Sequence, residues 1–177
     1  MAREFNIVTT GEGASASREM MITYLNTGTG SAPVWSSMGA KVFEGTINYD
    51  WGIETKTDIL GRTFTTAKTA NMTQTFSGSE IIAGDEVMNY LVDLAVVKKD
   101  ATQLVNQDCL IVHVYLKNDS QEAFAERYSA SAVTPTSIGG EGGAALVTDI
   151  EVAYGGKRET GTAKITDDGV VFTKGVA

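Results

Sequence analysis

The feature that most constrains this fold is the alternation of apolar and polar residues, which recurs in short segments along the chain. In residues 146–154, for example, Leu146 and Ile150 alternate with Asp149 and Glu151. Successive side chains of a β-strand point to opposite faces, so the pattern predicts strands with one buried and one hydrated face. Threonine and valine also far outnumber leucine, and β-branched residues favour strands. The sequence therefore predicts a mainly β protein.

Further segments of this kind are separated by stretches rich in Gly, Asn and Asp. Together they indicate about eight to ten strands, which favours a sandwich or a sheet that closes into a barrel. In the segment 42–51, Phe43, Ile47, Tyr49 and Trp51 are expected on the buried face. In the segment 124–134, Phe124, Tyr128, Ala130 and Ala132 are expected opposite Arg127, Ser129 and Ser131. The predicted strands are 20–26, 42–51, 54–60, 71–77, 108–117, 124–134, 146–154, 162–166 and 170–173.

One helix is predicted over Gly84–Lys99. Asp85 and Glu86 lie where the helix dipole is positive, and two lysines lie where it is negative, so both ends are electrostatically consistent. An apolar stripe at helical spacing continues nearly all the way round the cylinder, which indicates that the helix is covered on more than one side. We therefore expect three residues to pack against an adjacent subunit, or else beneath an arm or loop of the same chain. These residues are Met88, Val92 and Val96.

Two segments are expected to lie outside the regular core. Residues 1–19 are small and polar and show no periodicity, which predicts a flexible N-terminal arm before a single domain over 20–177. The segment Gly61–Thr69 joins two predicted strands and exceeds the usual hairpin loop of about 2 to 5 residues. Long loops in compact domains are usually functional or disordered, so it is a candidate contact site, with a mobile tip as the alternative. The candidate residues are Gly61, Arg62, Thr63, Phe64 and Thr65.

Charge and cysteine content exclude several classes of function. The net charge of −8 argues against a surface that binds nucleic acid by neutralising its phosphates. The chain has one cysteine, Cys109, and one histidine, His113, which together cannot complete a thiol zinc site. Both lie in a predicted core strand and are expected to be structural. No apolar stretch predicts a signal peptide or membrane insertion.

Two glycine-containing motifs invite a ligand-binding interpretation that their neighbours do not support. In the cluster 139–143, Glu141 would repel phosphate and no Lys-Ser/Thr pair follows, so a flexible turn is predicted. The segment Asp167-Asp168-Gly169 lacks the alternating ligands of a calcium loop and is predicted to be a hairpin turn. No catalytic constellation, cofactor or metal site is predicted, and we expect no enzymatic activity.

The segment 23–39, TYLNTGTGSAPVWSSMG, resembles the N-terminal signature of tail tube proteins. These proteins, also called major tail proteins, occur in long-tailed phages and phage-tail-like particles of Gram-positive bacteria. Further matches follow in order over most of residues 20–160, so the resemblance is more specific than any single motif. They are Tyr49-Asp50-Trp51, 57–61, 73–76, 83–85, 106–108, 125–132 and 139–143.

The resemblance implies a β-sandwich with one flanking helix, and a structural protein of the virion tail. Six copies would close into a ring whose inner strands form a continuous β-barrel, and the rings would stack into a hollow tube inside the host cytoplasm. The implied partners are further copies, a tape-measure protein, tail-end or baseplate proteins, and double-stranded DNA passing transiently at ejection. Whether a sheath protein surrounds the tube stays open. Family members use a long hairpin loop and terminal arms between subunits, which correspond by position to Gly61–Thr69 and 1–19.

An acidic chain suits a conduit for DNA, because a basic lumen would bind phosphates and hinder transit. Strand phase alone does not decide which carboxylates face inward. The candidates are Glu44, Glu54, Asp58, Asp149 and Glu151.

The alternative is that the chain is a monomeric β-sandwich module that binds carbohydrate. In that case Trp35, Trp51 and the tip loops would form a stacking platform. Negative-stain microscopy distinguishes the two, because rings or tubes favour the first interpretation and persistent monomers the second.

Overall fold

A computed structural model describes residues 4–9, 11–167 and 169–175. Most of these residues lie in strands, as predicted, and the helical residues form one flanking segment. The strands are β1 (Asn6–Ile7), β2 (Met21–Asn26), β3 (Trp35–Met38), β4 (Glu44–Asp50), β5 (Glu54–Thr57), β6 (Thr63–Thr66), β7 (Asn71–Glu80), β8 (Gln107–Lys117), β9 (Ala123–Gly139), β10 (Val147–Ala153), β11 (Arg158–Thr166) and β12 (Gly169–Lys174). The helical elements are η1 (Arg18–Met20), α1 (Glu86–Val92), η2 (Asp93–Lys98) and α2 (Ala101–Leu104).

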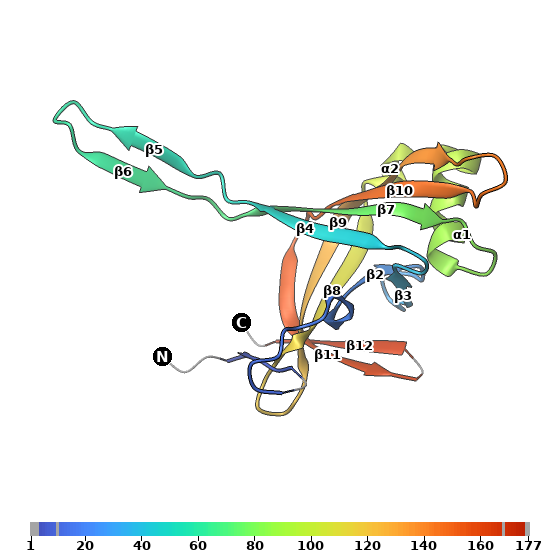
Figure 1. The fold of residues 1–177 in the computed structure, drawn as a ribbon, viewed down its shortest axis with the longest axis horizontal. Helices are drawn as coiled ribbons and strands as arrows, with labels where there is room; N and C mark the ends of the chain where they lie inside the picture. Colours follow the sequence, from blue (N-terminus) through green and yellow to red (C-terminus); the bar gives the residue numbers. More distant parts are fainter. Residues whose placement is uncertain (1–3, 10, 168, 176–177) are drawn as a thin grey trace.

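The main sheet is antiparallel and runs in the order β3-β2-β8-β9-β10-β7-β4. The long strand β9 belongs to both parts of it, because its first half pairs with β8 and β11 and its second half pairs with β10. Figure 1 shows these two parts crossing, with β4, β7 and β10 in one part, β8 and β11 in the other, and β9 running through both. Leu25, Phe76 and Val133 belong to the main hydrophobic cluster, which lies between the two parts.

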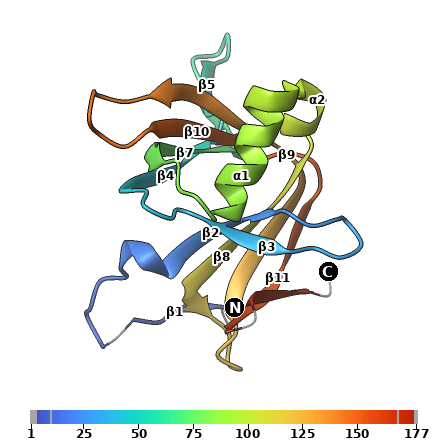
Figure 2. The same cartoon turned by 90° about the vertical axis from the view of Figure 1, so that its right-hand side faces the viewer.

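The helical segment covers one side of this core (Figure 2). The side chain of Asp85 accepts a hydrogen bond from the Met88 N–H at 3.1 Å and so caps α1. The position of the predicted helix is confirmed, but its last part, η2, is a π-helix rather than an α-helix. The helix ends at Lys99, which has a left-handed backbone with φ of 52°. The short helix α2 that follows was not predicted.

Several predicted strands are confirmed, including β2, β8, β10 and the hairpin of β11 and β12. Residue Asp168 of that hairpin lies outside the described residues. In β9, Ser131 was expected on the polar face but is fully buried. The reason is that β9 passes from one part of the sheet to the other, so its two faces change surroundings along its length.

The prediction of a buried apolar face on 42–51 is wrong for three of its four residues. Phe43 is 89% exposed, and Tyr49 and Trp51 are each about half exposed, whereas only Ile47 is partly covered. Strand β4 is the last strand of the sheet, and Phe43 and Trp51 lie just beyond its ends. The Tyr49 and Trp51 rings stack on each other instead, with centroids 6.1 Å apart.

The prediction of a loop over Gly61–Thr69 is also wrong. Its first half forms β6, which pairs with β5 in a separate two-stranded hairpin that extends far from the body (Figure 1). The turn is shorter and lies at 58–62, where the Asp58 carboxylate accepts hydrogen bonds from the N–H groups of Leu60 and Arg62 at 2.8 and 2.9 Å. Because that turn is closed by local hydrogen bonds, the threonine-rich segments before and after it pair with each other as β5 and β6.

The predicted N-terminal arm has two parts. In the first, β1 pairs with Leu116 and Lys117 of β8, and the Phe5 ring packs edge-on against Phe124 with centroids 5.0 Å apart. In the second, residues 11–19 are exposed. Residues 1–3 and 10 of this arm lie outside the described residues. Its flexibility in solution stays a prediction.

Candidate assembly surfaces

The outward face of one four-stranded region is polar and free of basic residues. This region consists of β4, β7, β10 and residues 132–139 of β9, none of which contains Lys or Arg. Its strand register aligns Thr46, Thr75, Glu151 and Thr134 in one row and Asn48, Thr73, Ala153 and Ala132 in the next. Directly paired residues share a face of the sheet. We call this surface the polar face, and its side chains are Glu44, Thr46, Asn48, Asp50, Asn71, Thr73, Thr75, Ser77, Ala132, Thr134, Glu151 and Ala153.

The five predicted lumen carboxylates have three different surroundings. Glu44 and Glu151 belong to the polar face. Among the described residues, Glu44 and Glu151 form no ion pair. Asp149 lies at an irregularity of β10, where its carboxylate accepts hydrogen bonds from the Gly78 N–H at 2.8 Å and the Ser137 hydroxyl at 3.1 Å. Asp149 therefore holds neighbouring strands in place.

The other two carboxylate candidates lie on the extended hairpin, each paired with a basic side chain. Glu54 lies 2.9 Å from the Lys56 ammonium, and Asp58 lies 2.9 Å from the Arg62 guanidinium. These pairs leave the hairpin without a local excess of negative charge.

The hairpin of β5 and β6 presents an exposed apolar tip. Its strands are joined on one face by hydroxyl contacts of Thr55 with Thr65 and Thr57 with Thr63, at 3.0 and 3.2 Å. At the tip Ile59 is fully exposed and Leu60 is 70% exposed. Isolated two-stranded hairpins are marginally stable in water, so this one is a candidate for contact with another chain. Of the predicted contact residues, Gly61 and Arg62 lie in the turn, and Thr63, Phe64 and Thr65 lie on β6.

The three helix residues predicted to meet a neighbour do not form one exposed surface. Met88 is 4% exposed and belongs to the protomer's own core, so it offers no surface to another subunit in this conformation. Val92 is half-buried, whereas Val96 is exposed next to Val97. Only the Val96 end of the helix remains a candidate contact.

Three segments that carry the resemblance meet in one hydrogen-bonded cluster. The Asn26 side-chain oxygen accepts hydrogen bonds from the N–H groups of Gly28 and Val34, both at 3.0 Å. Its amide nitrogen donates to Asp108 at 3.2 Å, and Asp108 also accepts two hydrogen bonds from Arg127. A Cβ at Gly28 would lie 2.5 Å from the Ala32 carbonyl oxygen, so only glycine fits there. The segments 23–39, 106–108 and 125–132 thus share a structural role.

A buried polar cluster around Glu126 was missed by the sequence analysis. This carboxylate accepts hydrogen bonds from Arg158 Nε at 2.6 Å and the Tyr128 hydroxyl at 2.9 Å, and His113 Nε2 lies 3.1 Å away. Burial alone would raise the pKa of Glu126, but the hydrogen bonds from His113, Arg158 and Tyr128 lower it to about 2. The cluster joins β8, β9 and β11, and His113 lies buried within it. Its structural role stays a prediction.

The two tryptophans of the alternative binding module do not form one platform. Trp35 lies on β3 with the Arg127 guanidinium 5.6 Å from its ring centroid, whereas Trp51 follows β4 and stacks on Tyr49. Strands β3 and β4 are the opposite ends of the strand order. Among the described residues, no group of three or more His, Cys, Asp or Glu side chains is placed to hold a metal ion. In the same part of the chain, no helix is long and apolar enough to span a membrane.

No protein-family model and no curated protein matches this chain. Among solved structures, it is similar to a chain of the sheath-tube complex of PVC, an extracellular contractile injection system, in the extended state. That match has 13% identity and a TM-score of 0.47, and covers 85% of this chain and 94% of the other. A chain of the tube-terminating cap of the anti-feeding prophage matches with 16% identity, a TM-score of 0.47 and coverage of 88% and 97%.

A chain of the anti-feeding prophage baseplate matches with 10% identity, a TM-score of 0.49 and coverage of 85% and 97%. These structural neighbours are chains of a sheath-tube complex, a tube-terminating cap and a baseplate. Because identity is low and the TM-scores are below 0.5, these matches assign no function to this chain.

Proposed function

We propose that this chain is a structural tail tube subunit of a long-tailed phage or phage-tail-like particle of Gram-positive bacteria. Six copies close into a ring, and the rings stack in the host cytoplasm into the hollow tube of the virion tail. The observation that carries the proposal is the polar face of β4, β7, β10 and residues 132–139, which lacks Lys and Arg.

This face suits the wall of a channel through which DNA passes. Lysine and arginine bind phosphates and would retain the DNA, whereas the short hydroxyl and amide side chains of Thr46, Asn48 and Thr73 offer no positive charge. Glu44 and Glu151 add negative charge to the same surface. With a net charge of −8 in each copy, the tube has a negative lumen and interacts with DNA only transiently and without sequence preference.

Ring closure satisfies the open edges of the same four strands. In the described residues, β4 pairs only with β7, and residues 132–139 of β9 pair on one side only, with β10. Open strand edges pair readily with another chain. We infer that the β4 edge of one copy meets the 132–139 edge of the next, with Pro135 contributing no N–H there. Closing the sheet in this way gives the inner barrel.

The exposed apolar residues outside the polar face serve contacts with further subunits. Ile59, Leu60 and Phe64 on the hairpin, and Val96 at the end of the helix, are exposed in the single protomer. Their burial in a ring or between rings would add to assembly, since exposed apolar patches mark interaction sites. The further partners are the tape-measure protein and tail-end or baseplate proteins, while a sheath stays an open question.

The test is electron microscopy of the purified protein at increasing concentration, followed by reconstruction of the assembled particle. We expect rings or tubes with Glu44, Thr73 and Glu151 facing the lumen. Persistent monomers, or tubes whose lumen is lined by another surface with net positive charge, would contradict the proposal.

Lysine substitution then tests the conduit role. The double variant Thr73→Lys and Thr134→Lys places positive charge on the polar face and should make assembled tubes retain DNA at low salt. A matched control introduces lysine at two exposed, uncharged positions away from that face, Ser120 and Gln121, and so adds the same charge. Equal DNA retention by both variants would show that the polar face does not line the channel.

A further inference from the structure

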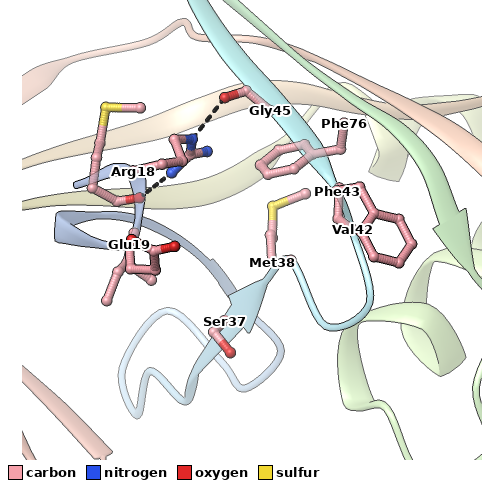
Figure 3. A pocket seen from close by; sticks show the side chains of 11 residues that line it. Arg18, Glu19, Ser37, Met38, Val42, Phe43, Gly45 and Phe76 are labelled. Carbon is pink, nitrogen blue, oxygen red and sulfur yellow. Dashed lines mark hydrogen bonds between the residues drawn. The ribbon is translucent and has the colours of Figure 1, made fainter.

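The outer edge of β4 is occupied at one point by a side chain from the N-terminal segment. Arg18, the first residue of η1, donates a hydrogen bond from Nε to the Gly45 carbonyl at 2.9 Å and another from Nη1 to the Met21 carbonyl at 2.5 Å (Figure 3). Gly45 lies on β4 and Met21 on β2, and these strands do not pair with each other. One guanidinium therefore joins two strands that share no backbone ladder.

The sequence of β4 is adapted to this contact. A Cβ added at Gly45 would lie 2.8 Å from Arg18 Nη2 and 3.3 Å from the Phe76 ring. Glycine inside a strand weakens it and often marks the close approach of another group. The close-up in Figure 3 shows that the approaching group here is the Arg18 side chain.

The contact lies beside a cavity of about 370 Å³ between the two ends of the sheet. Met38 of β3 and Phe76 of β7 line it, and the exposed Phe43 lies just before β4. Since β3 and β4 are the two terminal strands of the sheet order, Arg18 lies where the sheet remains open.

The segment that carries Arg18 runs directly into β2, and η1 also contacts β8, whereas its hydrogen bond to β4 comes from the Arg18 side chain. Residues 11–19 are exposed, so burial contributes little to keeping this segment against β4. Among the described residues Arg18 forms no ion pair with a carboxylate, and both of its hydrogen bonds go to backbone oxygens. Such a contact is reversible, because no hydrophobic surface has to be exposed to break it.

We propose that Arg18 is a latch that blocks the outer edge of β4 in the free subunit and is released when a second copy pairs there. The proposal rests on the proposed tube function. An incoming strand needs the Gly45 carbonyl as an acceptor, and in the free subunit that group already accepts from Arg18. The latch therefore slows the first subunit contact and leaves the assembled ring unaffected.

The test compares the lag before tube formation in Arg18→Ala and in the wild type, by light scattering with electron microscopy of the products. Loss of a charge-assisted hydrogen bond should shorten the lag about three- to tenfold at equal concentration. Lys164→Ala is the matched control, since it removes one exposed positive charge on β11, away from β4. Its lag should equal that of the wild type.

Two further variants separate the latch from a general effect of charge or stability. Arg18→Lys keeps the charge but has a single ammonium on a flexible stem, so its lag should lie between wild type and Arg18→Ala. In Gly45→Ala the added methyl group would clash with the Arg18 guanidinium and displace it, so the lag should also shorten. A thermal melt of this variant verifies that it is folded. Hydrogen exchange on the Arg18→Ala monomer should show faster exchange in 11–20 without loss of global stability.

The outcomes distinguish the latch from the tube function. If the wild type forms tubes and Arg18→Ala has an equal or longer lag, the latch is wrong and the tube function stands. If neither the wild type nor Arg18→Ala forms rings or tubes at any concentration, both proposals are overturned.

Discussion

The carboxylate of Asp108 on β8 accepts two hydrogen bonds from the guanidinium of Arg127 on β9, at 2.9 and 2.7 Å. The same carboxylate accepts a third hydrogen bond from the side-chain amide nitrogen of Asn26 at the end of β2. The side-chain oxygen of Asn26 in turn accepts hydrogen bonds from the Gly28 and Val34 N–H groups of the loop that follows. One partly buried ion pair thus connects three neighbouring strands and orients the loop between β2 and β3.

We predict that Asp108→Asn destabilises the protomer by about 1–3 kcal/mol, because it leaves the Arg127 guanidinium without its charged partner. Urea denaturation at pH 7 measures the change. Asp119→Asn, at an exposed turn, is the control and should change stability by less than about 0.5 kcal/mol. Equal stability of both variants would show that the pair contributes nothing.

The Glu126 cluster predicts a loss of stability in acid. The pKa of Glu126 is about 2 in the folded protein against 4.5 for the unperturbed group, because of its hydrogen bonds to His113, Arg158 and Tyr128. A carboxyl whose pKa falls on folding stabilises the protein above its unfolded pKa, and this contribution is lost as pH falls from about 4.5 toward 2. Glu126→Gln should be less stable at pH 7 and lose less stability over that range.

Urea titrations at pH 7, 4 and 3 test this prediction. Glu141→Gln, in the exposed turn after β9, is the control and should follow the wild type. A wild-type pH dependence in Glu126→Gln would show that the acid sensitivity has another origin.

The buried thiol of Cys109 should be inert in the folded state. Burial raises the pKa of this thiol to about 12, so almost no thiolate forms near neutral pH. We expect no reaction with a thiol-specific reagent at pH 8 in native buffer and complete reaction of one thiol in denaturing urea. Rapid labelling of the native protein would mean that β8 opens frequently.

Substitutions at the hairpin tip should impair assembly without affecting the stability of the protomer. Ile59→Asp with Leu60→Asp should leave the thermal melt unchanged, because both side chains are exposed in the protomer. The same double variant should abolish tube formation, because charge replaces the apolar contact surface. Ile165→Asp with Val171→Asp, at exposed positions of β11 and β12, is the control for adding two surface charges. Tubes of normal length from the double variant would exclude the tip as an assembly contact.

The sequence by itself determined the features that depend on neighbours along the chain. The period-two pattern of 146–154 correctly placed Ile150 inside and Glu151 outside, and the continuous apolar run of 108–117 correctly predicted the buried strand β8. The acidic first turn at Asp85 correctly marked the start of the helix. Such patterns predict elements because strand and helix periods are properties of the local backbone.

Only the tertiary structure decided which faces are covered and which distant residues meet. Periodicity could not show that β4 ends the sheet and leaves Tyr49 exposed, or that Met88 faces the core while Val96 does not. Nor could it place Arg158 beside Glu126, or Arg18 beside Gly45. Burial and charge pairing depend on contacts between residues far apart in the sequence, and a local pattern carries no information about which of these contacts form.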